Sequence, residues 1–180
     1  MPEPSQPNPD ATFHISRTVD APLDVVWKAY TEQEPLMAWF GPSGFSMPFS
    51  RFDLRPGGEF HYCLRTPTGF EMWGKWTFVD IVAPTKLSMV IAFSDAQGGL
   101  TRHPMSAAWP LQTLSSTTFT AAGADGDKTL IHIAWAPYQS TEDEIAAFRA
   151  GHASMTQGCN GSFAQLDAYL AQLPRSSPRP

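Results

Sequence analysis

Side chains that could carry out chemistry are scarce in this chain, and none shows the spacing of a known reaction centre. The sequence has no Gly-x-Ser-x-Gly nucleophile elbow, phosphate-binding loop, dinucleotide-binding glycine pattern or His-Glu-x-x-His zinc motif. Its histidines lack metal-ligand spacing and are His14, His61, His103, His132 and His152. We therefore expect no metal and no cofactor, and we do not favour an enzyme.

His152 is the polar residue with the most unusual position, because it falls inside a stripe of apolar residues. A buried imidazole needs a hydrogen-bond partner, and its pKa range suits a general acid or base. The pattern favours a plainer role, a core or rim histidine whose ring nitrogens are satisfied.

The stripe itself predicts one long amphipathic helix from Thr141 to Leu173. Only a short Pro/Ser-rich tail follows, so the stripe must lie on a sheet formed earlier in the chain. Gly151 and Gly158 flank it and allow either close packing or room for a small apolar molecule. The stripe residues recur at spacings of three and four: Ile145, Phe148, His152, Met155, Cys159, Phe163, Leu166, Leu170 and Leu173.

The preceding residues read mainly as strands joined by short turns. One strand precedes two helices, the first starting at Asp20–Pro22 and the second near residues 34–40. Short connections favour antiparallel pairing, so we expect an α+β fold of order β-α-α-β6-α, a sheet curved around one helix. The predicted strands span residues 13–19, 45–54, 59–65, 71–82, 86–93, 114–122 and 128–135.

Residues 94–113 interrupt this pattern with about 20 residues that show no periodicity. Met105, Trp109 and Leu111 are costly to leave in water, so we expect them to pack back onto the body of the protein. The segment is either a lid or rim over a pocket, or a packed structural loop.

Composition bounds the class of protein. The chain has 180 residues, 42% of them hydrophobic and 16% charged, which indicates one folded domain over residues 11–173 with flexible tails at 1–10 and 174–180. A net charge of −5 argues against nucleic-acid and anionic-membrane partners. Without a signal peptide or an apolar span, we expect a cytoplasmic protein with Cys63 and Cys159 reduced. No feature specifies an oligomeric state.

Strand alternation predicts which residues face the space under the helix. Aromatic content of 12% exceeds the need of a minimal core, and the surplus rings either line a pocket or form a large aromatic core. Gly74 would open space between large rings, Tyr62 would offer a hydroxyl, and Arg65 and Glu71 would form an exposed ion pair. The ligand-binding candidates are Tyr62, Met72, Gly74, Trp76, Met89, Ile91, Trp109, His152, Met155, Gly158 and Cys159.

Several local strings resemble a known group of proteins. They are Asp20-Ala21-Pro22 with Val26-Trp27, Trp39-Phe40-Gly41-Pro42, Asp53-Leu54-Arg55-Pro56-Gly57-Gly58, Gly74-Lys75-Trp76, and Ser154-Met155-Thr156-Gln157-Gly158 before Phe163 and Leu166. Over about residues 12–173 the chain resembles the START-like, or SRPBCC, helix-grip superfamily, in its bacterial branch named after the activator of the 90-kDa heat-shock-protein ATPase. The resemblance implies a helix-grip fold. Many relatives carry Trp where this chain has Cys159, and the smaller side chain would deepen a cavity.

The expected function is the binding of a small hydrophobic or aromatic molecule between helix and sheet. One alternative is a chaperone-accessory or protein-interaction module, which an exposed apolar patch outside the cavity would favour. A second is a cyclase- or hydrolase-type enzyme using His152 or Tyr62 as proton carrier, which convergent polar groups with shifted pKa values would favour.

Overall fold

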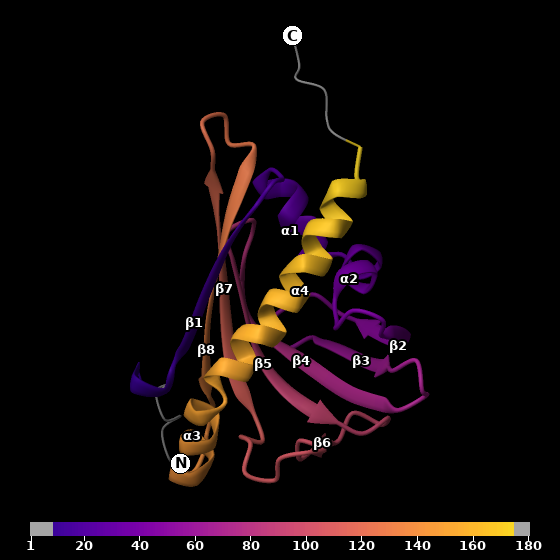
Figure 1. Ribbon diagram of the computed structural model, residues 1–180, viewed down its shortest axis with the longest axis vertical. Helices are drawn as coiled ribbons and strands as arrows, with labels where there is room; N and C mark the ends of the chain where they lie inside the picture. The colour runs from indigo at the N-terminus through magenta and orange to yellow at the C-terminus, as the bar shows by residue number, and fades with distance from the viewer. Residues whose placement is uncertain (1–8, 175–180) are drawn as a thin grey trace.

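The computed structural model describes residues 9–174, in which one antiparallel sheet curves around a long helix (Figure 1). The sheet order is β1-β8-β7-β5-β4-β3-β2, and the short β6 pairs with β5. The strands are β1 (Phe13–Val19), β2 (Ser46–Phe52), β3 (Glu59–Arg65), β4 (Glu71–Val82), β5 (Lys86–Ser94), β6 (Leu100–Thr101), β7 (Thr113–Ala122) and β8 (Lys128–Pro137). The predicted α+β helix-grip architecture is confirmed.

The helices lie on the inner face of this sheet, and they are α1 (Leu23–Thr31), α2 (Gln33–Trp39), α3 (Glu142–Ala150) and α4 (His152–Gln172), with a 3-10 turn at Pro9–Ala11. In Figure 1 α4 runs diagonally across the sheet, with α1 and α2 beside its C-terminal half. The indole N–H of Trp39 donates a hydrogen bond of 2.8 Å to the carbonyl of Ala29, which fixes α2 against α1.

The prediction of a single helix over residues 141–173 was wrong in one respect, because the chain breaks at Gly151 between α3 and α4. A Cβ at Gly151 would lie 2.8 Å from Cζ3 of Trp109, so glycine is needed for that ring to seat on the break. Apolar spacing continues through the break, and periodicity alone therefore could not reveal it. α3 begins at a capping box in which Thr141 and Glu144 satisfy each other's backbone N–H groups.

The packed core lies under the C-terminal half of α4. Phe163 and Leu166 are buried there against rings and aliphatic side chains of the sheet and of α1 and α2. A second, smaller cluster forms under α3 from Phe13, Phe148 and Met155. The predicted ion pair of Arg65 and Glu71 is present on the surface of the sheet, where Arg65 Nε donates a hydrogen bond of 3.0 Å to Glu71 Oε1.

Residues 94–113 contain more order than the sequence indicated. Asp95 organises a turn by accepting hydrogen bonds from the backbone N–H groups of Gln97 and Gly99, after which β6 returns along β5. Met105 is 86% exposed, so the expectation that it packs back onto the body was wrong. Trp109 and Leu111 are partly buried, as expected. A loop without periodicity gives no indication of which apolar side chains turn inward.

Most of the two predicted tails, at residues 1–10 and 174–180, lies outside the described residues 9–174. Within that range, no helix has the length and hydrophobicity required to cross a membrane.

Candidate functional site

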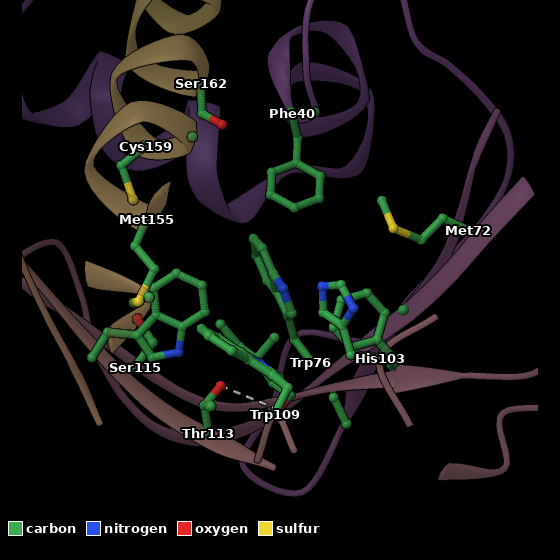
Figure 2. A pocket seen from close by; sticks show the side chains of 18 of the residues that line it. Phe40, Met72, Trp76, His103, Trp109, Thr113, Ser115, Met155, Cys159 and Ser162 are labelled. Carbon is green, nitrogen blue, oxygen red and sulfur yellow. Dashed lines mark hydrogen bonds between the residues drawn. The ribbon is translucent and has the colours of Figure 1, made fainter. Parts of the chain in front are cut away.

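A cavity of about 730 Å³ separates the N-terminal half of α4 from the inner face of the sheet. Figure 2 shows Met155, Cys159 and Ser162 of α4 on one side of it, with Thr113 and Ser115 of β7 below. Its volume lies within the range of about 300–1,000 Å³ that is usual for small-molecule sites. The cavity exists because small residues occupy this part of the helix, whereas Leu and Phe occupy the part that packs the core.

Ten of the eleven candidate residues line this cavity. They are Tyr62, Met72, Gly74, Trp76, Met89, Ile91, Trp109, Met155, Gly158 and Cys159. They come from β3, β4, β5, the segment before β7, and α4, so the fold brings together residues that are far apart in sequence.

His152 is the candidate that does not line the cavity. Its ring packs between Phe13 and Phe148, with both ring centroids 5.4 Å away. The helix breaks one residue earlier, at Gly151, so a continuous helical wheel misplaces the direction of this side chain. Its Nε2 atom is buried and has no hydrogen-bond partner among the described residues.

An aromatic wall forms the side of the cavity next to α2. The ring of Phe40 lies 4.9 Å from that of Trp76 in edge-to-face geometry (Figure 2). It lies 5.2 Å from the ring of Tyr62, again edge to face. Gly74 is paired with Tyr62 across the strands, and a Cβ on it would lie 2.6 Å from the Tyr62 hydroxyl oxygen. Gly74 therefore admits the Tyr62 ring, rather than leaving open space as the sequence suggested.

Gly151 and Gly158, the two helix glycines that the sequence singled out, have different surroundings. Gly151 is in close contact with Trp109, as described above. At Gly158, by contrast, an added Cβ would meet no atom of a neighbouring element within 4 Å. Gly158 is exposed and therefore lies at the open rim of the cavity, whereas Gly151 allows close packing.

A row of hydroxyl groups on β7 was missed from the sequence. Thr113, Ser115 and Thr117 line the cavity and are almost fully buried. Both faces of β7 are rich in Ser and Thr, so alternation alone gave no inward face. The usable signal was Phe119, a large apolar residue that shares its face with these three odd-numbered positions.

Every titratable side chain in the lining is shifted toward its uncharged form. Burial raises the pKa of the Cys159 thiol to about 11. Burial also raises the pKa values of Tyr30 and Tyr62 and lowers the pKa of His103, a lining residue that the sequence had not singled out. Desolvation disfavours the charged form of each group, so the cavity is electrically neutral near pH 7.

Residues 102–111 close the end of the cavity nearest α3. Trp109 stacks 5.2 Å from Phe148 at a tilt of 40°, and His103 packs 4.6 Å from Phe93. The guanidinium of Arg102 forms an ion pair with Glu144 in the capping box of α3 and donates to the carbonyl of Trp109. One side chain thus ties this covering segment to the start of α3.

Comparison with known proteins identifies the group to which this architecture corresponds. Residues 20–171 match the family described as "Activator of Hsp90 ATPase homolog 1-like protein". That match spans most of the chain and includes α1, α2, the sheet from β2 to β8, and nearly all of α4. No curated protein matches the chain.

Solved structures of bacterial proteins share the fold. Protein Ms6760 from Mycobacterium smegmatis is 23% identical, with a TM-score of 0.71 over 92% of this chain and 95% of that one. Protein NE0264 from Nitrosomonas europaea is 22% identical, with a TM-score of 0.69 over 93% and 99% of the two chains. The AHSA1 protein SPO3351 from Silicibacter pomeroyi is 12% identical, with a TM-score of 0.67 over 89% and 97%. At these identities the likeness establishes the fold alone.

Proposed function

The chain belongs to the Activator of Hsp90 ATPase homolog 1-like family, and we propose that it binds a small apolar or aromatic molecule in the cavity between α4 and the sheet. The observation that carries the proposal is the cavity itself, about 730 Å³ lined largely by aromatic rings, aliphatic groups and methionines. Water in a cavity with such a lining finds few hydrogen-bond partners, so its displacement by an apolar molecule is favourable.

The lining is suited to a ligand with rings. Phe40 and Trp76 present their rings to the cavity, and Met72 and Met155 present flexible thioethers from other sides (Figure 2). Tyr62 adds a third ring beside Phe40. Aromatic contacts favour offset or edge-to-face partners, and methionine adapts to irregular shapes. Burial of apolar surface would supply most of the affinity, at roughly 25 cal/mol per Å² before the cost of association is subtracted.

A matched pair of helix variants tests this proposal. Gly158→Leu places a side chain at the rim of the cavity, whereas Gly161→Leu makes the same change at a second exposed position on α4 that does not line it. Both variants gain helix propensity. We expect Gly158→Leu to weaken binding of the neutral dye N-phenyl-1-naphthylamine at least about tenfold, or about 1.4 kcal/mol, and Gly161→Leu to leave it unchanged. Equal affinity in the two variants would contradict the proposal.

An interaction module is the second candidate, favoured by the exposure of apolar side chains outside the cavity. Met105 is 86% exposed and Phe70 is 57% exposed. The family's name suggests a direct assay, the ATPase rate of an Hsp90 protein with and without this chain. Stimulation that Met105→Ser abolishes and Gly158→Leu leaves intact would favour this function over ligand binding.

The enzyme alternative receives no support from the two residues on which it relied. His152 lies outside the cavity lining, between Phe13 and Phe148. Burial raises the pKa of Tyr62 well above its ordinary value, so its hydroxyl stays protonated and is a poor proton donor near neutral pH.

A further inference from the structure

We propose that the cavity selects an uncharged ligand and holds a carbonyl or hydroxyl oxygen of that ligand beside Ser115 and Thr117 on the sheet. This inference rests on the proposed function and adds two properties to it: the charge of the ligand and the position of its polar group. The first follows from what the lining lacks, and the second from donors that have no protein partner.

The lining contains no Asp, Glu, Lys or Arg among the described residues. On β3 and β4 the charged side chains occupy the opposite face, where Lys75 Nζ lies 3.1 Å from Glu59 Oε1 and Arg65 pairs with Glu71. A carboxylate, sulfonate or ammonium that entered the cavity would lose its hydration and find no counter-charge. The titratable lining groups are themselves held neutral by burial. The cavity therefore discriminates against ions of either sign.

A polar group of the ligand still has a place to bind. Strand register sets Ser115 of β7 between Met89 of β5 and Trp135 of β8, so these three residues form one row across the inner face. Ser115 and its neighbour on the same face, Thr117, make no side-chain hydrogen bond among the described residues, whereas Thr113 donates to the carbonyl of Ile91 at 3.4 Å. Two buried hydroxyls thus remain available at the floor of the cavity.

The usable polar groups are these hydroxyls and not the indole of Trp135, because Trp135 Nε1 has no hydrogen-bond partner in the described part of the chain but is closed off from the cavity. A hydroxyl group can donate a hydrogen bond to a ligand oxygen. A ligand oxygen that lies between Ser115 and Thr117 can accept from both. A neutral ring system carrying a ketone, aldehyde, ester or hydroxyl oxygen meets these conditions.

Three naphthalene dyes separate the two properties. N-phenyl-1-naphthylamine is neutral and has no carbonyl. 8-Anilinonaphthalene-1-sulfonate carries the same ring system with a sulfonate, and prodan is a neutral naphthalene with a ketone. Each is titrated by fluorescence into the wild type, and the part of the signal that Gly158→Leu removes is taken as cavity binding. We expect the sulfonate dye to bind the cavity at least about tenfold more weakly than its neutral counterpart.

The position of the polar group is tested with Ser115→Ala and Thr117→Val. Each should weaken prodan binding about fivefold, as expected for one hydrogen bond between uncharged groups, and leave N-phenyl-1-naphthylamine unaffected. Ser116→Ala is the control, because that residue is on the opposite face and bonds to Ser88 at 3.1 Å. It should change neither dye.

The outcomes are distinguishable. Cavity binding of the sulfonate dye within threefold of the neutral dye would overturn the charge selection. Prodan affinity that is indifferent to both Ser115→Ala and Thr117→Val would overturn the polar position. Both results would leave the proposed function standing. If N-phenyl-1-naphthylamine shows no binding that depends on Gly158, the proposed function itself fails, and this inference fails with it.

Discussion

The two halves of α4 face the same sheet and do opposite things with it. Residues 163–172 bring Phe163, Leu166 and Leu170 into the core, where each is buried. Residues 152–162 bring Gly158, Cys159 and Ser162 to the same sheet and leave a cavity. Small side chains on α4 thus coincide with the cavity and larger ones with the core, and Phe163 marks the boundary because it is buried in the core and also lines the cavity.

The largest expected effect on this comparison is a loss of stability from truncation in the packed half. Leu166 is fully buried and does not line the cavity, so Leu166→Ala should lower the free energy of unfolding by about 2–5 kcal/mol. Urea denaturation measures the loss. Met155→Ala, in the cavity half, should cost less because its neighbours already face open volume. A larger loss for Met155→Ala would reverse the assignment of the two halves.

A second change tests the sheet opposite the cavity half. Gly74→Ala places a Cβ 2.6 Å from the Tyr62 hydroxyl, so the ring must move. We expect a loss of about 1–3 kcal/mol in stability, the usual cost of overpacking, together with weaker binding of N-phenyl-1-naphthylamine. In a Tyr62→Ala background, where the ring is absent, Gly74→Ala should cost less stability than it does in the wild type. If the alanine at position 74 costs the same in both backgrounds, Tyr62 is not what it displaces.

A third test concerns the segment that covers the cavity half. Arg102→Gln removes the ion pair with Glu144, and hydrogen exchange in residues 102–111 should quicken while β7 and β8 stay slow. We expect an effect of about 1 kcal/mol or less on global stability, because the Arg102 side chain is half exposed. Addition of a ligand should slow exchange in this segment if it acts as a lid. Exchange as slow as that of the strands, with or without ligand, would make it a packed structural loop.

The same ion pair has a pH dependence whose sign follows from the pKa of Glu144. Burial raises that pKa, but the hydrogen bonds from Arg102 and from Thr141 outweigh burial and lower it overall. The carboxylate therefore contributes stability above its unfolded pKa, and the contribution is lost as pH falls through the lowered folded pKa. Between pH 7 and pH 3, Glu144→Gln should reduce the acid-induced loss of stability. If Glu144→Gln leaves the pH dependence of stability unchanged, the Glu144 carboxylate does not contribute to it.

The smallest expected effect concerns the reactivity of the Cys159 thiol. Because burial raises the pKa of Cys159 to about 11, its thiol should react slowly with iodoacetamide at pH 8 and faster as pH approaches 11. Occupation of the cavity by N-phenyl-1-naphthylamine should slow the reaction further. Mass spectrometry of the labelled peptide follows both changes. Rapid labelling at pH 8 that the dye does not affect would place Cys159 outside the cavity.

Much of the fold could be predicted from the sequence because its signals are local. The strands at residues 59–65 and 71–82 were predicted with the bounds of β3 and β4, since Gly and Pro mark the turns around them. The inward face of this hairpin followed from large rings at alternate positions. These two strands supplied four of the residues that line the cavity: Tyr62, Met72, Gly74 and Trp76.

The rest depended on contacts between distant segments. Gly151, at the break, is in close contact with Trp109, which lies 42 residues earlier in the chain, so the helical periodicity gave no sign of it. The hydroxyl row of β7 was hidden because both faces of that strand are polar. The exposure of Met105, an apolar residue, could not be predicted, because a non-periodic loop does not reveal which of its side chains turn inward.

Native mass spectrometry of the protein purified from the cells that make it tests the central claim most directly. We expect the wild type and Gly161→Leu to carry a small, uncharged molecule that organic extraction releases, and Gly158→Leu to carry much less of it. The same molecule retained at equal occupancy in all three proteins would contradict the account, because the open volume beside Gly158 would then not be where it binds.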